Sequence, residues 1–206
     1  MPKFDDQYYF ILSIQDERVP FMTPDEDTTS RQFGFKKIPI GSKPLVFLNG
    51  AYDIQKRKRL EPINPPPDFL FCGSDVLIKD EVREKLLRYE IPNLAIQPAI
   101  YIDHKNVWHE DRWYLTFLNF FDCWDRHNST HGDVTIDFDE NNKLYDVYTY
   151  SLNEKILEET PLEYRRLFKM GGTSEGMVVA HMSVASLFHG SGAVVIPIAE
   201  YGVSFP

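Results

Sequence analysis

Short apolar runs separated by turn-forming segments recur along this chain. Strand-like length and aromatic or β-branched content are shared by residues 8–14, 94–102, 113–123, 134–138 and 144–150. Clear helical periodicity is confined to residues 80–90. Many short strands with few helices predict an α+β fold with a mixed or antiparallel sheet.

The predicted helix at residues 80–90 has one apolar stripe. Val82, Leu86 and Tyr89 recur at i, i+4 and i+7, which places them on one face. Asp80 precedes this stripe and is a residue type that caps helix N-termini. We therefore expect the helix to begin at Asp80 and to pack through that stripe.

The segment between the expected strands at residues 134–138 and 144–150 predicts a β-hairpin. Residues 139–143 read Asp-Glu-Asn-Asn-Lys, and asparagine tolerates the positive φ of tight turns. Asp137 and the residues after it also resemble the start of an EF-hand loop. However, Asn142 stands where that loop needs glycine and Tyr148 where it needs a bidentate glutamate, so the hairpin is the preferred interpretation.

A strand–helix–strand pattern occurs twice in the sequence. The first copy runs from Leu70 through the helix to the strand containing Pro98. The second runs from Leu167 through a short helix to the strand containing Pro197, so the offset is 97 to 99 residues. The chain therefore predicts two similar halves, although two ordinary patterns can also match by coincidence.

We expect a single domain over residues 1–206, divided into four segments. They are an N-terminal strand with an irregular segment (1–64), the first strand–helix–strand unit (65–110), an aromatic strand with the hairpin (111–160) and the second unit (161–206).

The formal net charge is −9, with a hydrophobic content of 43%. This charge argues against nonspecific binding to nucleic acids and anionic membranes, because both need a positive field. Residues 176–199 contain no charge and are long enough to span a bilayer, but His181, His189 and a glycine turn favour a buried interpretation. The two cysteines, Cys72 and Cys123, are expected to be buried free thiols in a reducing, cytoplasmic compartment.

Candidate catalytic motifs are incomplete. Residues 172–176 match the G-x-S-x-G elbow around Ser174, but no Ser–Asp–His order follows in the remaining residues. His127 and His131 have a spacing that zinc could bridge on a helix, yet the residues between them favour a loop. No Walker loop and no G-x-G-x-x-G motif is present, so we expect no cofactor. The basic tract at residues 56–59 is expected to be a solvated loop.

One aromatic segment resembles a known bacterial family. Residues 120–125, Phe-Phe-Asp-Cys-Trp-Asp, followed by Ser129, resemble the strand and Asp-x-x-Asp-x-x-x-Ser turn of the immunity protein 11 family, also called the myxobacterial-type immunity domain. Residues 67–69, 76–78 and 166–170 resemble other parts of that family. The likeness covers roughly residues 65–201.

This resemblance implies a protein that neutralises a cognate bacterial toxin by direct stoichiometric binding. Such proteins are often encoded beside a polymorphic toxin or a type VI secretion effector, and the family has no agreed catalytic residues. The resemblance thus implies a cytoplasmic non-enzyme, monomeric or homodimeric, whose partner is the toxin.

The local acidic bias suggests where a toxin would bind. Candidate contact residues are Asp122, Asp125, Asp137, Asp139 and Glu140. If the toxin were a basic nuclease, such a patch would mimic phosphate. For Asp122 and Asp125 the competing role is to cap the turn after the strand.

Two alternatives to protein binding stay open. One is a hydrolase that uses Ser174 or a His127/His131 metal site. The other is a small-ligand module with an aromatic pocket near residues 113–124.

Overall fold

The computed structural model describes residues 3–139 and 142–202. With 19% helix and 38% strand in mixed and antiparallel sheets, it confirms the α+β class. The strands are β1 (Tyr8–Ser13), β2 (Met22–Pro24), β3 (Leu45–Asn49), β4 (Phe69–Cys72), β5 (Asp75–Lys79), β6 (Leu94–Ile102), β7 (Trp108–Phe117), β8 (Phe120–Phe121), β9 (Thr130–Asp139), β10 (Asn142–Thr149), β11 (Leu167–Met170), β12 (Val178–His181) and β13 (Ala193–Pro197).

The helices are short and lie between these strands. They are α1 (Glu26–Ser30), α2 (Tyr52–Lys58), α3 (Asp80–Leu86), α4 (Glu154–Glu159) and α5 (Met182–Ala185), with single 3-10 turns η1 (Leu162–Tyr164), η2 (Ser186–Phe188) and η3 (Ile198–Glu200). None of the helices in the described part is long and apolar enough to cross a membrane.

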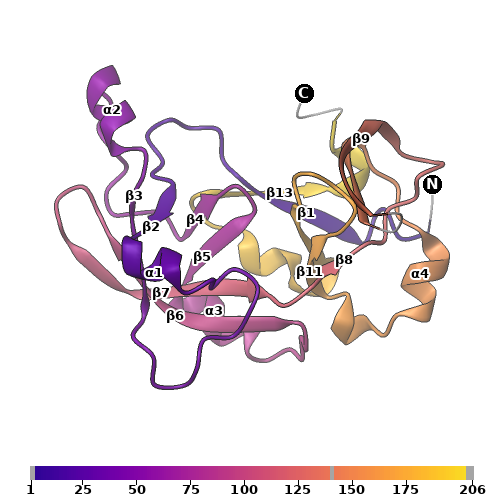
Figure 1. The fold of residues 1–206 in the computed structure, drawn as a ribbon, viewed down its shortest axis with the longest axis horizontal. Coiled ribbons are helices and arrows are strands. Elements are labelled where there is room, and N and C mark those ends of the chain that lie inside the picture. Colours follow the sequence, from indigo (N-terminus) through magenta and orange to yellow (C-terminus); the bar gives the residue numbers. More distant parts are fainter. Residues whose placement is uncertain (1–2, 140–141, 203–206) are drawn as a thin grey trace.

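Two large sheets form the body of the molecule. One has six strands in the order β2-β3-β6-β7-β5-β4, and the other has five in the order β13-β1-β12-β11-β8. Helix α2 projects at one end of the molecule, while α4 and the β9–β10 hairpin lie at the other end (Figure 1). The antiparallel pairing of β9 with β10 confirms the predicted hairpin.

A central core joins the two sheets face to face. Phe69 and Ile78 of the six-stranded sheet share it with Leu167 and Ala180 of the five-stranded sheet. Successive side chains of a strand point to opposite faces, so Leu77 lies in a separate core on the outer face of the six-stranded sheet. Helices α3 and α5 both pack into the central core.

The outer face of the five-stranded sheet has a core of its own. Trp124 is fully buried there among residues of β1, β11 and β12, and Leu157 of α4 covers one side of this core. On the opposite outer face, Phe33 and Ile38 of a long loop pack over the six-stranded sheet. These side chains hold the loop against the body of the molecule.

The two predicted halves share one topology. In each half, an antiparallel hairpin leads into a short helix and then a third strand. A strand from another part of the chain lies in the sheet between the hairpin and that third strand. The matching cross-strand rows are Phe69–Ile78–Trp113–Pro98 and Leu167–Ala180–Tyr9–Pro197. The two prolines therefore occupy the same place in both halves.

This register refines the sequence alignment of the halves. It pairs Phe69 with Leu167, one residue away from the match of Leu70 with Leu167. The inserted strand is β7 in the first half and β1 in the second, so the N-terminal strand completes the C-terminal half. The segment boundary expected at residue 110 falls inside β7.

Several local expectations were wrong. Lys79, not Asp80, is the N-cap of α3, and Asp80 instead accepts a hydrogen bond from Trp113 Nε1. The basic tract forms the end of helix α2 rather than a loop. Cys72 is exposed because it ends β4 at a tight turn, whereas Cys123 is buried as expected.

Candidate protein-binding cleft

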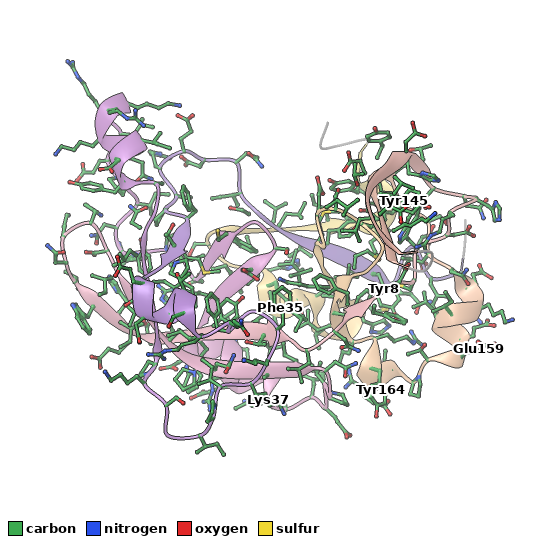
Figure 2. All side chains as sticks on the ribbon, viewed as in Figure 1. Tyr8, Phe35, Lys37, Tyr145, Glu159 and Tyr164 are labelled. Atoms are coloured by element: carbon green, nitrogen blue, oxygen red, sulfur yellow. The ribbon has the colours of Figure 1, made fainter. Side chains whose placement is uncertain are left out.

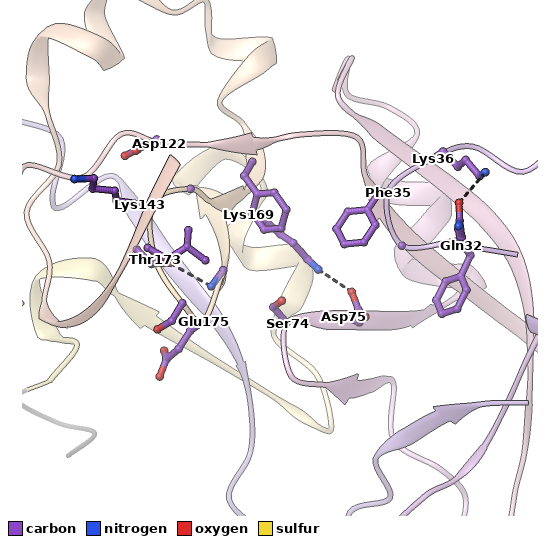
Figure 3. Close-up of a pocket in the computed structure, with 18 residues that line it drawn as sticks. Gln32, Phe35, Lys36, Ser74, Asp75, Asp122, Lys143, Lys169, Thr173 and Glu175 are labelled. Carbon is purple, nitrogen blue, oxygen red and sulfur yellow. Dashed lines mark hydrogen bonds and ion pairs between the residues drawn. The ribbon is translucent and has the colours of Figure 1, made fainter. Parts of the chain in front are cut away.

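An open cleft of about 1220 Å³ lies where the two large sheets meet the hairpin (Figure 3). Its walls come from segments far apart in the sequence. They are loop 32–36, Ser74 and Asp75 at the β4–β5 turn, Phe120 and Asp122, Lys143 and Leu144 of β10, Lys169 of β11 and loop 171–176.

An ion pair between the two sheets lies at the floor of the cleft. Lys169 Nζ of β11 is 2.7 Å from Asp75 Oδ1 of β5, and the Lys169 side chain is only 7% exposed. The ammonium also lies 5.8 Å and 5.9 Å from the ring centroids of Phe117 and Phe120. Charge pairing and ring contacts together hold this buried cation in place.

Two phenylalanines form the lip of the cleft. Phe35 is 70% exposed and Phe120 is 46% exposed, and their ring centroids are 6.4 Å apart. Phe35 belongs to the loop (Figure 3) and Phe120 to β8, so they reach the cleft from different elements. An exposed aromatic pair beside a cleft is a typical feature of binding surfaces.

The glycine-rich loop beside the cleft is a tight turn. Gly172 has φ +70°, and a Cβ there would lie 2.6 Å from both Asp122 Oδ2 and Arg126 Nη2. Ser174 Oγ donates to the Asp146 carboxylate, and Ser174 N donates to Tyr145 O at 3.0 Å. Within residues 3–139 and 142–202, no histidine hydrogen-bonds to Ser174, so the serine–histidine arrangement of a hydrolase is not formed.

The two candidate zinc ligands do not form a chelating pair. The His131 ring packs edge-on against Trp124 and Tyr145, with centroids 5.4 Å and 5.1 Å away, and His131 Nδ1 is 2.7 Å from Gly132 O. His127 is an exposed turn residue. In the part of the chain that the structure describes, no group of three His, Cys, Asp or Glu side chains could hold a metal ion.

Neither tryptophan of the aromatic segment at residues 113–124 lines the cleft. Trp124 is fully buried, and Trp113 is covered by the Arg83 guanidinium, 3.8 Å from its ring. Phe120 is the member of this segment that lines the cleft. A ligand site in this region would therefore be the cleft itself.

The candidate acidic contact residues do not lie together in one patch. Asp122 lines the cleft and pairs with both Arg126 terminal nitrogens at 2.5 Å. Asp137 is exposed on β9, 3.7 Å from Lys143 Nζ. The Asp139 side chain and Glu140 lie outside the described residues.

Asp125 caps the turn after β8. Its Oδ1 accepts from His127 N at 2.8 Å and its Oδ2 from Asn128 Nδ2 at 2.8 Å. The Asn128 amide, with the backbone N–H groups, holds the pKa of the Asp125 carboxyl below its ordinary value. These contacts support a turn-capping role for Asp125.

Asp122 and Ser174 were candidates from the sequence and line the cleft, but sequence reasoning missed the other residues that build it. Lys169 and Asp75 are far apart in the chain, and only the packing of the sheets brings them together. Lys36 had a detectable signal, because residues 28–52 contain four basic residues and no acidic one. That stretch is unusual in a chain with net charge −9.

No protein-family model matches the chain, and no curated protein sequence is significantly similar to it. The resemblance to the immunity family therefore stays a proposal.

Proposed function

We propose that the chain is an immunity protein that neutralises a cognate bacterial toxin or secretion effector by binding it stoichiometrically. The observation that carries the proposal is the cleft with Phe35 and Phe120 exposed at its lip. Aromatic side chains near the centre of an interface supply much of the binding energy. The resemblance of residues 65–201 to immunity proteins supports the choice of partner.

The shape of the cleft suits a segment of another protein. Its volume of about 1220 Å³ exceeds the range of about 300–1,000 Å³ that is usual for small-molecule sites. The polar groups at its floor already have partners, since Lys169 pairs with Asp75 and Ser174 with Asp146. A partner protein could therefore bury surface in the cleft without breaking these two pairs.

Co-expression with the toxin-like product of the neighbouring gene tests this proposal. The chain should restore growth and form an equimolar complex in size-exclusion chromatography with light scattering. Hydrogen exchange should slow on binding in residues 32–36 and 171–176. A complex that leaves both segments unprotected would contradict the role of the cleft, and failure to form any complex would contradict the immunity function.

Matched variants separate binding from catalysis. Phe35→Ala should weaken the complex by about tenfold or more, because it removes an aromatic anchor. Phe21→Ala removes an exposed aromatic outside the cleft and should have no effect. Ser174→Ala should still neutralise the toxin, whereas loss of neutralisation with the complex intact would favour the hydrolase alternative.

A further inference from the structure

We infer that the partner segment bound in the cleft is acidic and carries an apolar side chain. This inference rests on the proposed function and names the chemistry of the partner at the same site. It reverses the expectation of an acidic contact patch, because it assigns recognition to the basic wall of the cleft.

The carboxylates that line the cleft are engaged within the chain. Asp75 pairs with Lys169, and Asp122 pairs with Arg126. Glu175 accepts a hydrogen bond from the Tyr201 hydroxyl at 3.2 Å. An incoming basic segment would therefore compete with existing partners.

The lysines of the loop at residues 32–43 are not paired in this way. Lys36 lines the cleft, whereas Lys37 and Lys43, further along the same loop, line a neighbouring hollow beside β6, and all three are exposed. Among the described residues none of the three makes an ion pair, and Lys36 Nζ has only Gln32 Oε1 at 3.4 Å. Their positive charge is thus available to carboxylates of a partner.

The loop that carries these lysines is held in a defined position. Phe33 packs edge-on against Phe47 and Tyr114, with centroids 5.6 Å and 5.0 Å away. Gln97 Oε1 accepts from Ile38 N at 2.6 Å. Phe35 lies between these two anchors and faces the middle of the molecule (Figure 2).

This arrangement displays an aromatic ring beside cations without a large ordering cost on binding. An apolar side chain of the partner packs against the exposed Phe35–Phe120 pair, and flanking carboxylates reach Lys36 and Lys37. Electrostatic attraction of this kind raises the association rate and weakens with salt. A protein segment with a few carboxylates fits better than a nucleic acid, because the net charge of −9 disfavours a continuous run of phosphates.

A display selection with random peptides of about 12 residues tests the inference, since such peptides cover this kind of extended recognition. Peptides retained by the full chain and not by Phe35→Ala should be enriched in Asp and Glu around a large apolar residue. Enrichment of basic or uncharged peptides, or no enrichment, would overturn it. Tighter binding of a single-stranded oligonucleotide than of the best peptide would also overturn it.

Paired charge reversals supply the control. Lys36→Glu with Lys37→Glu should weaken the selected peptide by about tenfold or more, with a smaller salt dependence. Lys56→Glu with Arg57→Glu makes the same change in net charge on helix α2, away from the cleft, and should have little effect. Equal losses would mean that only net charge matters, which contradicts a specific site.

The two proposals fail separately. If the toxin complex forms and tolerates Phe35→Ala and the Lys36/Lys37 reversal, the immunity function stands and the acidic-segment inference fails. If acidic peptides are selected but no toxin complex forms, the inference stands and the immunity function fails.

Discussion

Lys169 Nζ lies 2.7 Å from Asp75 Oδ1, and this ion pair connects the two large sheets. The pair is asymmetric, because the Lys169 side chain is 7% exposed and that of Asp75 is 36% exposed. Asp75→Ala would leave a buried ammonium without its ion partner, and we expect a loss of about 3 kcal/mol in unfolding free energy. Lys169→Met leaves a carboxylate that water can reach, so its cost should be about 1 kcal/mol.

Denaturant unfolding of both variants and of the double variant measures this asymmetry. The double variant should be more stable than Asp75→Ala alone, since it removes the uncompensated cation. Equal losses in the two single variants would contradict the assigned burial.

Gly192 and Gly41 have similar backbone conformations but differ in how closely other atoms surround them. Both have positive φ, +93° and +86°. A Cβ at Gly192 would collide with the Phe69 carbonyl oxygen and lie 2.8 Å from Pro67 Cβ, whereas a Cβ at Gly41 meets nothing within 4 Å. Gly41→Ala should therefore cost about 1 kcal/mol, from strain alone.

Gly192→Ala should cost clearly more, by about 2 kcal/mol or above, because the turn before β13 would have to move away from β4. Thermal unfolding of the two variants under the same conditions measures the difference. Similar midpoints would show that the contact between this turn and β4 relaxes easily.

Much of the fold was predictable because strand patterns are local. Residues 94–102 were predicted as a strand, and β6 has the same bounds. The partner of each strand was not predictable in this way. Insertion of β1 between β12 and β13 is a contact between the two ends of the chain, and no local pattern encodes it.

The candidate site was harder to predict for the same reason. Lys169 lies in the strand Leu-Phe-Lys-Met, where a lysine predicts an exposed position. It is buried because Asp75 and two phenylalanine rings from other segments surround its ammonium. Phe35 is the reverse case, since an apolar residue in a polar loop predicts burial and yet it is exposed.

The two cysteines should react at very different rates. Cys72 is exposed, whereas full burial raises the pKa of Cys123 well above its ordinary value of 9.0. One thiol per native chain should react with Ellman's reagent, and the other only after unfolding. Partial burial and the Asp75 charge also raise the pKa of Cys72, so its reaction should accelerate as the pH rises through 9.0 and beyond.

Cys72→Ser should abolish the reaction of the native chain and lower the total after unfolding from two thiols to one. Rapid reaction of both thiols in the native state would contradict the burial of Cys123.

Asp68 connects the two halves of the molecule and should make their docking sensitive to acid. Its carboxylate is 2.8 Å from Lys79 Nζ, 3.0 Å from Ser191 N and 2.8 Å from Ser191 Oγ. Partial burial acts to raise the pKa of Asp68, but the Lys79 ammonium and the Ser191 donors outweigh it, and the pKa lies below its ordinary value of 3.8.

A carboxyl whose pKa is lower in the folded than in the unfolded chain stabilises the fold above its unfolded pKa. That stabilisation is lost as the pH falls through 3.8 toward the folded pKa. The unfolding free energy should therefore drop more steeply in the wild type than in Asp68→Asn between about pH 5 and about pH 3. Asp137→Asn, which removes an exposed carboxylate 3.7 Å from Lys143, should keep the wild-type slope. Parallel curves for the wild type and Asp68→Asn would mean that the contacts with Lys79 and Ser191 do not favour the ionised carboxylate.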